Sequence, residues 1–108
     1  MKLFRQGDVL LKRTKRRDRT GTDLRSDGRI ILAYGEVTGH AHTVVADTPS
    51  EAVPAAFFEE PGGRRFLFVD QACLVTHQEH GSLALAPGVY EVVRQREYAP
   101  DAIRSVED

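Results

Sequence analysis

Hydrophobic and polar positions alternate in short runs along this chain. The runs are rich in valine, leucine, isoleucine, phenylalanine and tyrosine, and glycine, proline and aspartate separate them. No stretch shows the period of about 3.6 residues that marks an amphipathic helix. We therefore expect about eight strands, at residues 8–14, 29–34, 40–46, 56–60, 64–70, 72–77, 82–86 and 89–98.

Many short strands without helices predict an all-β fold. We expect one small β-barrel or β-sandwich domain over residues 1–108, because such architectures hide the edges of their sheets. The polar segment at about residues 14–28 should form a mobile basic loop, and a short C-terminal tail should occupy about residues 99–108.

The composition narrows the classes of protein that fit. Hydrophobic residues make up 41% and charged residues 29% of the chain, which excludes a disordered or fibrous protein. No apolar run approaches the roughly 18 residues of a membrane span, so we expect a cytoplasmic protein with no membrane partner. The single cysteine, Cys73, excludes a disulfide within one chain and a cysteine-based zinc site.

The charges are unevenly distributed. Residues 1–29 carry ten Lys or Arg and four Asp, which gives +6, and the remaining residues carry five and twelve, which gives −7. Much of the positive charge lies in "KRTKRRDR", Lys12–Arg19. This segment can attract the phosphates of a nucleic acid, or it can keep a surface loop solvated.

The four histidines form two tight clusters, and they are the strongest candidates for a functional site. His40 and His42 in "GHAH" lie two residues apart, so on a strand both side chains point to the same face. His77 and His80 in "THQEH" suit a strand end that bends into a turn. If the clusters are adjacent, these four residues can bind one divalent ion of zinc, iron, nickel or manganese. The alternatives are acid–base chemistry without metal, or no site.

Two further residues are candidates for catalysis. Glu79 lies between the second pair of histidines, where it can support a ligand, act as a base on a metal-bound water or simply occupy a surface turn. Arg94 and Arg96 follow Tyr90 on one face of the last strand. A guanidinium there, Arg96 above all, can orient a small anionic substrate or form an ion pair.

Part of this pattern resembles a known family. "GEVTGHAHTVVAD" is similar to the first half of the cupin motif, with Gly35, His40, His42 and Asp47 in the corresponding places. The resemblance implies a small β-barrel that holds iron, manganese, nickel or zinc. The second half differs, since "APGVYEV" follows the last histidine instead of preceding it. The segments "QGDVLL", "AYGEVTGHAH", "HQEH" and "PGVYEVVRQREY" also resemble a group of small uncharacterised bacterial and phage proteins.

Three functions are compatible with these features. We expect first a divalent-metal-binding β-barrel protein; whether it is also an enzyme acting on a small anionic substrate is open. The second is a nucleic-acid-binding or RNA-cleaving protein that uses histidine acid–base chemistry and the basic loop. The third is a structural or regulatory module of a phage or mobile element. In each case copies can associate as a homo-oligomer through the basic and acidic surfaces.

Overall fold

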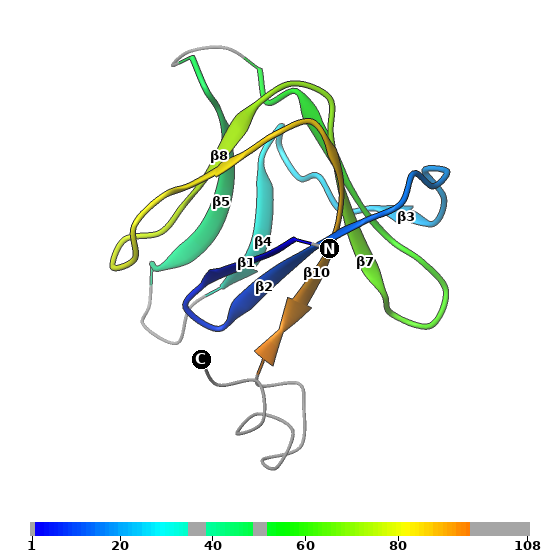
Figure 1. Cartoon of the computed structure of the whole chain (residues 1–108), viewed down its shortest axis with the longest axis horizontal. Coiled ribbons are helices and arrows are strands. Elements are labelled where there is room, and N and C mark those ends of the chain that lie inside the picture. The colour runs from blue at the N-terminus through cyan, green and yellow to red at the C-terminus, as the bar shows by residue number, and fades with distance from the viewer. Residues whose placement is uncertain (1, 35–38, 49–51, 96–108) are drawn as a thin grey trace.

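The computed structural model describes residues 2–34, 39–48 and 52–95, and within them the chain forms ten strands in two antiparallel sheets (Figure 1). The larger sheet has the order β1 (Leu3–Gln6), β2 (Val9–Thr14), β10 (Gly88–Arg94), β7 (Arg65–Val69), β6 (Ala55–Glu59) and β3 (Thr22–Asp23). The smaller sheet has the order β4 (Ile30–Tyr34), β5 (Ala41–Ala46), β8 (Cys73–Thr76) and β9 (Leu83–Leu85).

The expected all-β fold is confirmed, and each of the eight predicted strands has a counterpart. The described strands do not close into a barrel, and their arrangement is that of a β-sandwich. Two strands, β1 and β3, were not predicted. In the described residues we find no helix of the length and apolarity that crossing a lipid bilayer requires.

The core lies between the two sheets. Alternate residues of each strand point inward, as the pleat of a β-strand requires. On β10, for example, Tyr90 and Val92 are buried, and Arg94 follows them on the same face as expected. The buried apolar residues of the core include Val9, Leu11, Ile30, Leu32, Val44, Phe57, Leu67, Val75 and Leu85.

The first hairpin brings the start of the chain to the site described below. β1 and β2 pair antiparallel with Gln6 opposite Val9, so Gly7 and Asp8 form a two-residue turn. Gly7 has φ of 59°, a left-handed conformation that glycine adopts without steric cost. β2 also pairs with β10, with Val9 opposite Arg94, so this turn lies beside the end of the last strand.

The basic segment Lys12–Arg19 begins in β2, and two of its later arginines lie over aromatic rings of β7. The guanidinium of Arg17 lies 4.1 Å from the ring centre of Phe66, and that of Arg19 lies 5.3 Å from the ring centre of Phe68. Arg17 also makes paired hydrogen bonds to Glu60. The segment thus covers buried aromatic rings, whereas the mobility expected for about residues 14–28 stays a prediction.

Candidate functional site

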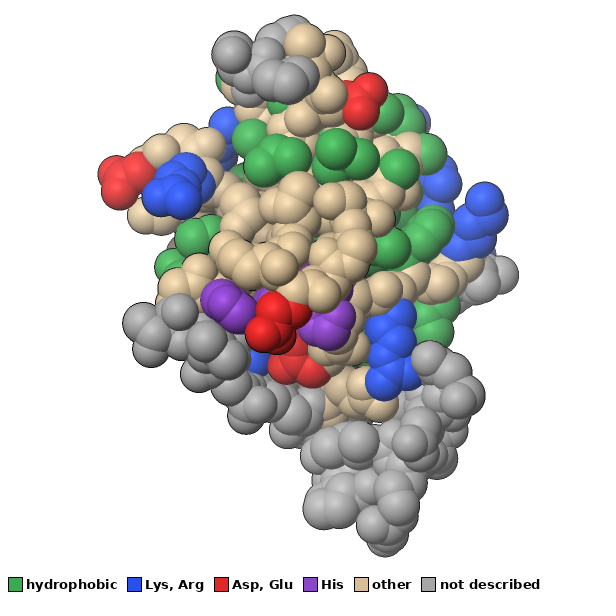
Figure 2. Space-filling model, turned by 90° about the vertical axis from the view of Figure 1, so that its left-hand side faces the viewer, with side chains coloured by type: hydrophobic (Ala, Val, Ile, Leu, Met, Phe, Trp, Pro, Cys, Tyr) green, Lys and Arg blue, Asp and Glu red, His purple; other side chains and the backbone are tan. Residues whose placement is uncertain are grey.

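The two histidine clusters meet in the fold. β5 carries His42 and pairs with β8, which ends just before His77, so the two histidine-bearing segments are neighbours. The ring centres of His42 and His77 are 4.3 Å apart, and those of His77 and His80 are 4.7 Å apart. His40 lies 5.7 Å from His77 by the same measure. We call these four residues the histidine cluster, and Figure 2 shows histidine and acidic side chains gathered on one face of the molecule.

The four imidazoles differ in burial. His42 points inward on the same face of β5 as Val44, and only 1% of its surface is exposed. His40 and His77 are half-buried, and His80 is exposed. The site therefore has one histidine anchored in the core, two that are half-buried and one, His80, that is exposed and whose ring can rotate.

Gln6 determines which nitrogen of His42 carries the proton. The amide nitrogen of buried Gln6 donates to the carbonyl oxygens of Val75, at 2.9 Å, and Gly81, at 2.8 Å. Its amide oxygen therefore faces His42 Nδ1, at 2.8 Å, and can only accept a hydrogen bond. Nδ1 must be the donor. In the neutral ring, Nε2 then carries a lone pair and no proton.

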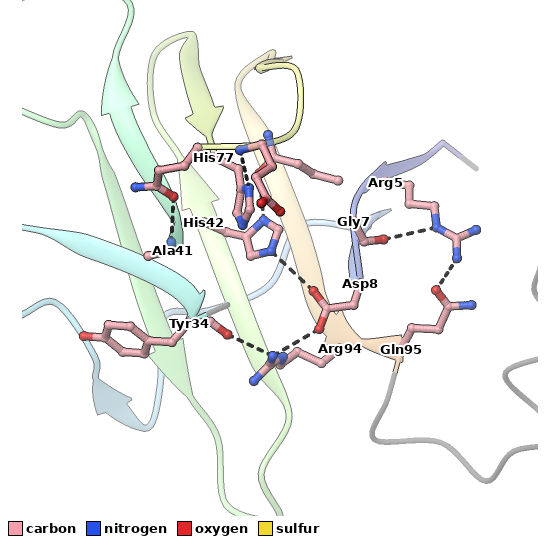
Figure 3. Close-up of polar contacts among 12 residues, drawn as sticks. Arg5, Gly7, Asp8, Tyr34, Ala41, His42, His77, Arg94 and Gln95 are labelled. Carbon is pink, nitrogen blue, oxygen red and sulfur yellow. Dashed lines mark hydrogen bonds and ion pairs between the residues drawn. The ribbon is translucent and has the colours of Figure 1, made fainter. Parts of the chain in front are cut away.

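Asp8 lies directly opposite that lone pair. Its Oδ1 is 3.3 Å from His42 Nε2, and its Oδ2 accepts a hydrogen bond of 3.0 Å from the Arg94 guanidinium (Figure 3). The same guanidinium donates to the carbonyl oxygen of Tyr34, at 2.9 Å. Of the two roles expected for a guanidinium on this strand, Arg94 takes the ion pair. This ion pair orients the Asp8 carboxylate toward the His42 imidazole.

The turn that carries Asp8 is held from both sides. The backbone nitrogen of Gln95 donates to the carbonyl oxygen of Asp8 at 2.7 Å, and Arg5 donates to the carbonyl oxygen of Gly7 at 3.3 Å and to the side chain of Gln95. His80 packs over the turn. A Cβ on Gly7 would lie 2.7 Å from His80 Nε2, so a side chain at this position would force the His80 ring to move.

The electrostatics of the anchored pair follow from these contacts. Burial, followed by the charge of His77, lowers the pKa of His42 to about 4. Burial alone would raise the pKa of Asp8, but the hydrogen bond and charge of Arg94 outweigh it, and the pKa is lowered. Burial and the charges of His80 and His40 lower the pKa of His77. At neutral pH a neutral His42 therefore faces an ionised Asp8.

The loop that carries the second histidine pair is fastened to β5. Gln78 accepts a hydrogen bond of 2.9 Å from the backbone nitrogen of Ala41. The backbone nitrogen of Glu79 donates to His77 Nδ1 at 3.0 Å, so the neutral His77 ring carries its proton on Nε2. The Glu79 carboxylate lies 3.8 Å from His40 Nδ1, and 60% of its side chain is exposed.

A closed metal centre is not assembled in this arrangement. In the described parts of the chain, no group of three or more His, Cys, Asp or Glu side chains is placed to hold a metal ion. The rings explain why: His77 Nδ1 is engaged by the Glu79 backbone, and the His42 and His80 rings lie 6.3 Å apart and nearly parallel. Binding would need the exposed His80 ring, and the half-buried His77 ring, to rotate toward His42.

The structure brings together some of the predicted residues and separates others. The four histidines and Glu79 lie together, whereas Arg96 lies outside the described residues. Asp47, the acidic residue of the cupin-like pattern, follows the opposite end of β5 from His42. Five residues of extended strand put about 16 Å between them, so Asp47 does not join the cluster.

Sequence reasoning missed the residues of the first turn. Gln6 and Asp8 contact His42 directly, and Gly7 gives His80 its place. The signal was present in "QGDV", because glycine followed by aspartate between two apolar runs is typical of a two-residue hairpin turn.

The basic segment forms a separate feature on the larger sheet. A hollow of about 550 Å³ lies between it and the adjoining ends of β7 and β10, lined in part by Arg13, Arg16, Arg17 and Arg19. Arg17 is paired with Glu60, and Arg19 is paired with Asp70. The two ion pairs explain the positions of Arg17 and Arg19 without a bound ligand. The interaction of Lys12–Arg19 with nucleic acid stays a prediction.

Fold and site together define a small β-sandwich protein with a buried His–Gln–Asp network beneath surface histidines. Residues 5–95 match the family described as Domain of unknown function (DUF8820), and the chain belongs to this family. The expectation of an uncharacterised family is thereby confirmed, while the cupin relationship stays a prediction. No curated protein and no solved structure matches the chain.

Proposed function

We propose that this protein binds one divalent metal ion through the histidine cluster. The observation that carries the proposal is the state of His42. Its Nδ1 proton is committed to Gln6, which leaves Nε2 as a bare donor next to two other imidazoles. A metal-binding histidine typically has this arrangement, in which the second ring nitrogen donates to a fixed acceptor.

The available donors limit the choice of metal. Nitrogen and oxygen ligands suit zinc, iron, nickel and manganese. Cys73 supplies no thiolate, because it lies on β8 with 1% exposure and burial, followed by the charge of Asp47, raises its pKa to about 11. His80 is exposed, so its ring can turn toward His42 without any change in the core, and the half-buried rings of His40 and His77 lie beside it.

A catalytic role would use the exposed side of this site. A metal ion can supply a reactive water or polarise a substrate oxygen, provided that one coordination position stays open. Glu79 is near enough to His40 to support that ligand or to take a proton from a bound water. A small anionic substrate, with Arg96 orienting it, is the corresponding proposal for an enzyme.

Metal titration of protein purified without an affinity tag tests the proposal. Metal-free protein is titrated with Zn²⁺, Fe²⁺, Ni²⁺ or Mn²⁺ by calorimetry, and elemental analysis follows dialysis. We expect about one ion per chain, and a metal at 100 times its dissociation constant should stabilise the fold by about 2.7 kcal/mol. His42→Ala should lose both effects.

The matched control is Asp47→Asn, which alters an exposed carboxylate at the opposite end of β5 from His42. This variant should bind metal as the natural sequence does, whereas a cupin-like ligand set would make it lose affinity. Absence of stoichiometric binding by every ion, with no change in thermal stability, would overturn the proposal. Cleavage of RNA in the presence of a chelator would instead support the acid–base alternative.

A further inference from the structure

The contact between His42 and Asp8 favours a positive charge between them. Gln6 holds the proton of the neutral His42 ring on Nδ1, so Nε2 presents a lone pair to the Asp8 carboxylate. Two acceptors facing each other at 3.3 Å repel unless a proton or another cation lies between them. The gap is too short for a bridging water, which needs a hydrogen bond to each side.

The distance between the two atoms is compatible with a metal ion between them. A charged N–H···O hydrogen bond is shorter, at about 2.7–2.9 Å. An octahedral ion with bonds of about 2.1 Å places neighbouring ligand atoms about 3.0 Å apart. A tetrahedral ion with bonds of about 2.0–2.1 Å places them about 3.3–3.4 Å apart. The observed 3.3 Å between His42 Nε2 and Asp8 Oδ1 is compatible with two ligands of one metal ion.

We propose that Asp8 is a metal ligand and that the ion lies between Asp8 Oδ1 and His42 Nε2. This rests on the proposed function and adds a carboxylate from the first hairpin to its histidines. After rotation of its ring toward His42, His80 is the next ligand, because its Nε2 lies over Gly7, the residue before Asp8 in the same turn. Among the described residues, His80 has no hydrogen-bond partner that would hold it back.

Both anchored ligands already have the partners that a metal site needs. Gln6 orients the His42 ring through Nδ1, and Arg94 orients the Asp8 carboxylate through Oδ2. Such outer partners fix ligand geometry and typically change metal affinity by about 10–100-fold. A site with two imidazoles and one carboxylate leaves a position for water, and it favours divalent zinc or iron over monovalent copper.

Asp70 provides a matched control for substitutions at Asp8, because it too forms an ion pair with an arginine, Arg19. In a Zn²⁺ titration, Asp8→Asn should weaken binding by about 100-fold or more, since loss of a ligand exceeds loss of an outer partner. Asp70→Asn should bind as the natural sequence does. Circular dichroism in chelator shows whether each variant is folded.

A variant that gains an absorption band tests the role of Asp8 even if substitutions at this position lower the stability of the protein. Asp8→Cys replaces the carboxylate by a thiolate, and Co²⁺ bound to a thiolate shows a sulfur-to-cobalt charge-transfer band in the near ultraviolet. We expect this band in Asp8→Cys and not in Asp70→Cys. The natural protein should lack it, because its Cys73 is buried in β8 with a raised pKa.

The outcomes separate the two proposals. If neither Zn²⁺ nor Co²⁺ binds the natural protein, the proposed function fails and the role of Asp8 fails with it. A second outcome is that metal binds the natural protein and His42→Ala abolishes binding, while Asp8→Asn keeps full affinity and Asp8→Cys shows no band. That outcome overturns only the inference about Asp8. Loss of affinity in Asp8→Asn together with the band in Asp8→Cys establishes it.

Discussion

Replacing Gln6 by methionine should destabilise the protein far more than a conservative change at one residue suggests. Methionine has a similar length and volume, so the packing around position 6 is largely retained. The substitution removes the amide that donates to Val75 and Gly81 and accepts from His42. These bonds join the first hairpin to the opposite sheet.

The magnitude follows from the burial of the three hydrogen bonds. Two are buried, to Val75 and His42, and one is partly buried, to Gly81. A hydrogen bond contributes about 0.5–1.5 kcal/mol net, with the two buried bonds near the upper end of this range and the partly buried bond near the lower end. The sum is about 3 kcal/mol. With a urea slope of about 1.5 kcal/mol/M, the unfolding midpoint should fall by about 2 M.

Urea unfolding of metal-free protein, followed by circular dichroism, measures this loss. Gln78→Met is the control, because Gln78 is exposed and makes a single hydrogen bond to the backbone of Ala41. That variant should lose no more than about 1 kcal/mol. If Gln6→Met costs under 1 kcal/mol, the amide does not hold the hairpin and the assignment of the His42 proton is wrong.

Three further results are expected. Burial, with the charge of His77 next, lowers the pKa of His42 from 6.5 to about 4. The free energy of unfolding of metal-free protein should therefore be highest above pH 6.5 and fall by about 3 kcal/mol as the pH falls to 4. In chemical denaturation, His42→Gln should flatten this dependence on pH. Gly7→Ala should cost about 1–2 kcal/mol at φ 59° and shift the NMR signals of the His80 ring, which an unchanged spectrum would contradict. Burial raises the pKa of Cys73 to about 11, so a thiol reagent at pH 8 should react with Cys73 only as urea unfolds the protein. Rapid labelling in buffer without urea would contradict this prediction, because it would show an exposed thiol.

The strands could be predicted because their signal is local. Each alternating run, such as "RFLFVD", buries one set of side chains between the sheets, and the pleat itself produces that pattern. β1 was missed because "LFRQ" is only four residues long, and the first expected strand was placed at residues 8–14. Gly7 lies in the hairpin turn that joins both strands.

The candidate site was predictable only in part, because some of its contacts join strands that are far apart in the sequence. His40 and His42 are two residues apart, so the alternation of side chains along a strand predicts that they lie on the same face. Their proximity to His77 depends on the pairing of β5 with β8, which no local pattern specifies. Asp8 was missed because it reaches His42 through the register of another sheet, and its partner Arg94 lies 86 residues away in the sequence.

The ion pair between Asp8 and Arg94 also has a consequence for the order of events in folding. It joins residues 86 positions apart, and the flanking pair of β2 and β10 closes the same long loop. Closing such a loop costs entropy before its contacts form, so we expect the pairing to form in a late, slow step of folding. During synthesis, His42 and Asp8 are made long before Arg94. The carboxylate therefore acquires its fixed direction only when β10 has been added, and this strand completes the site.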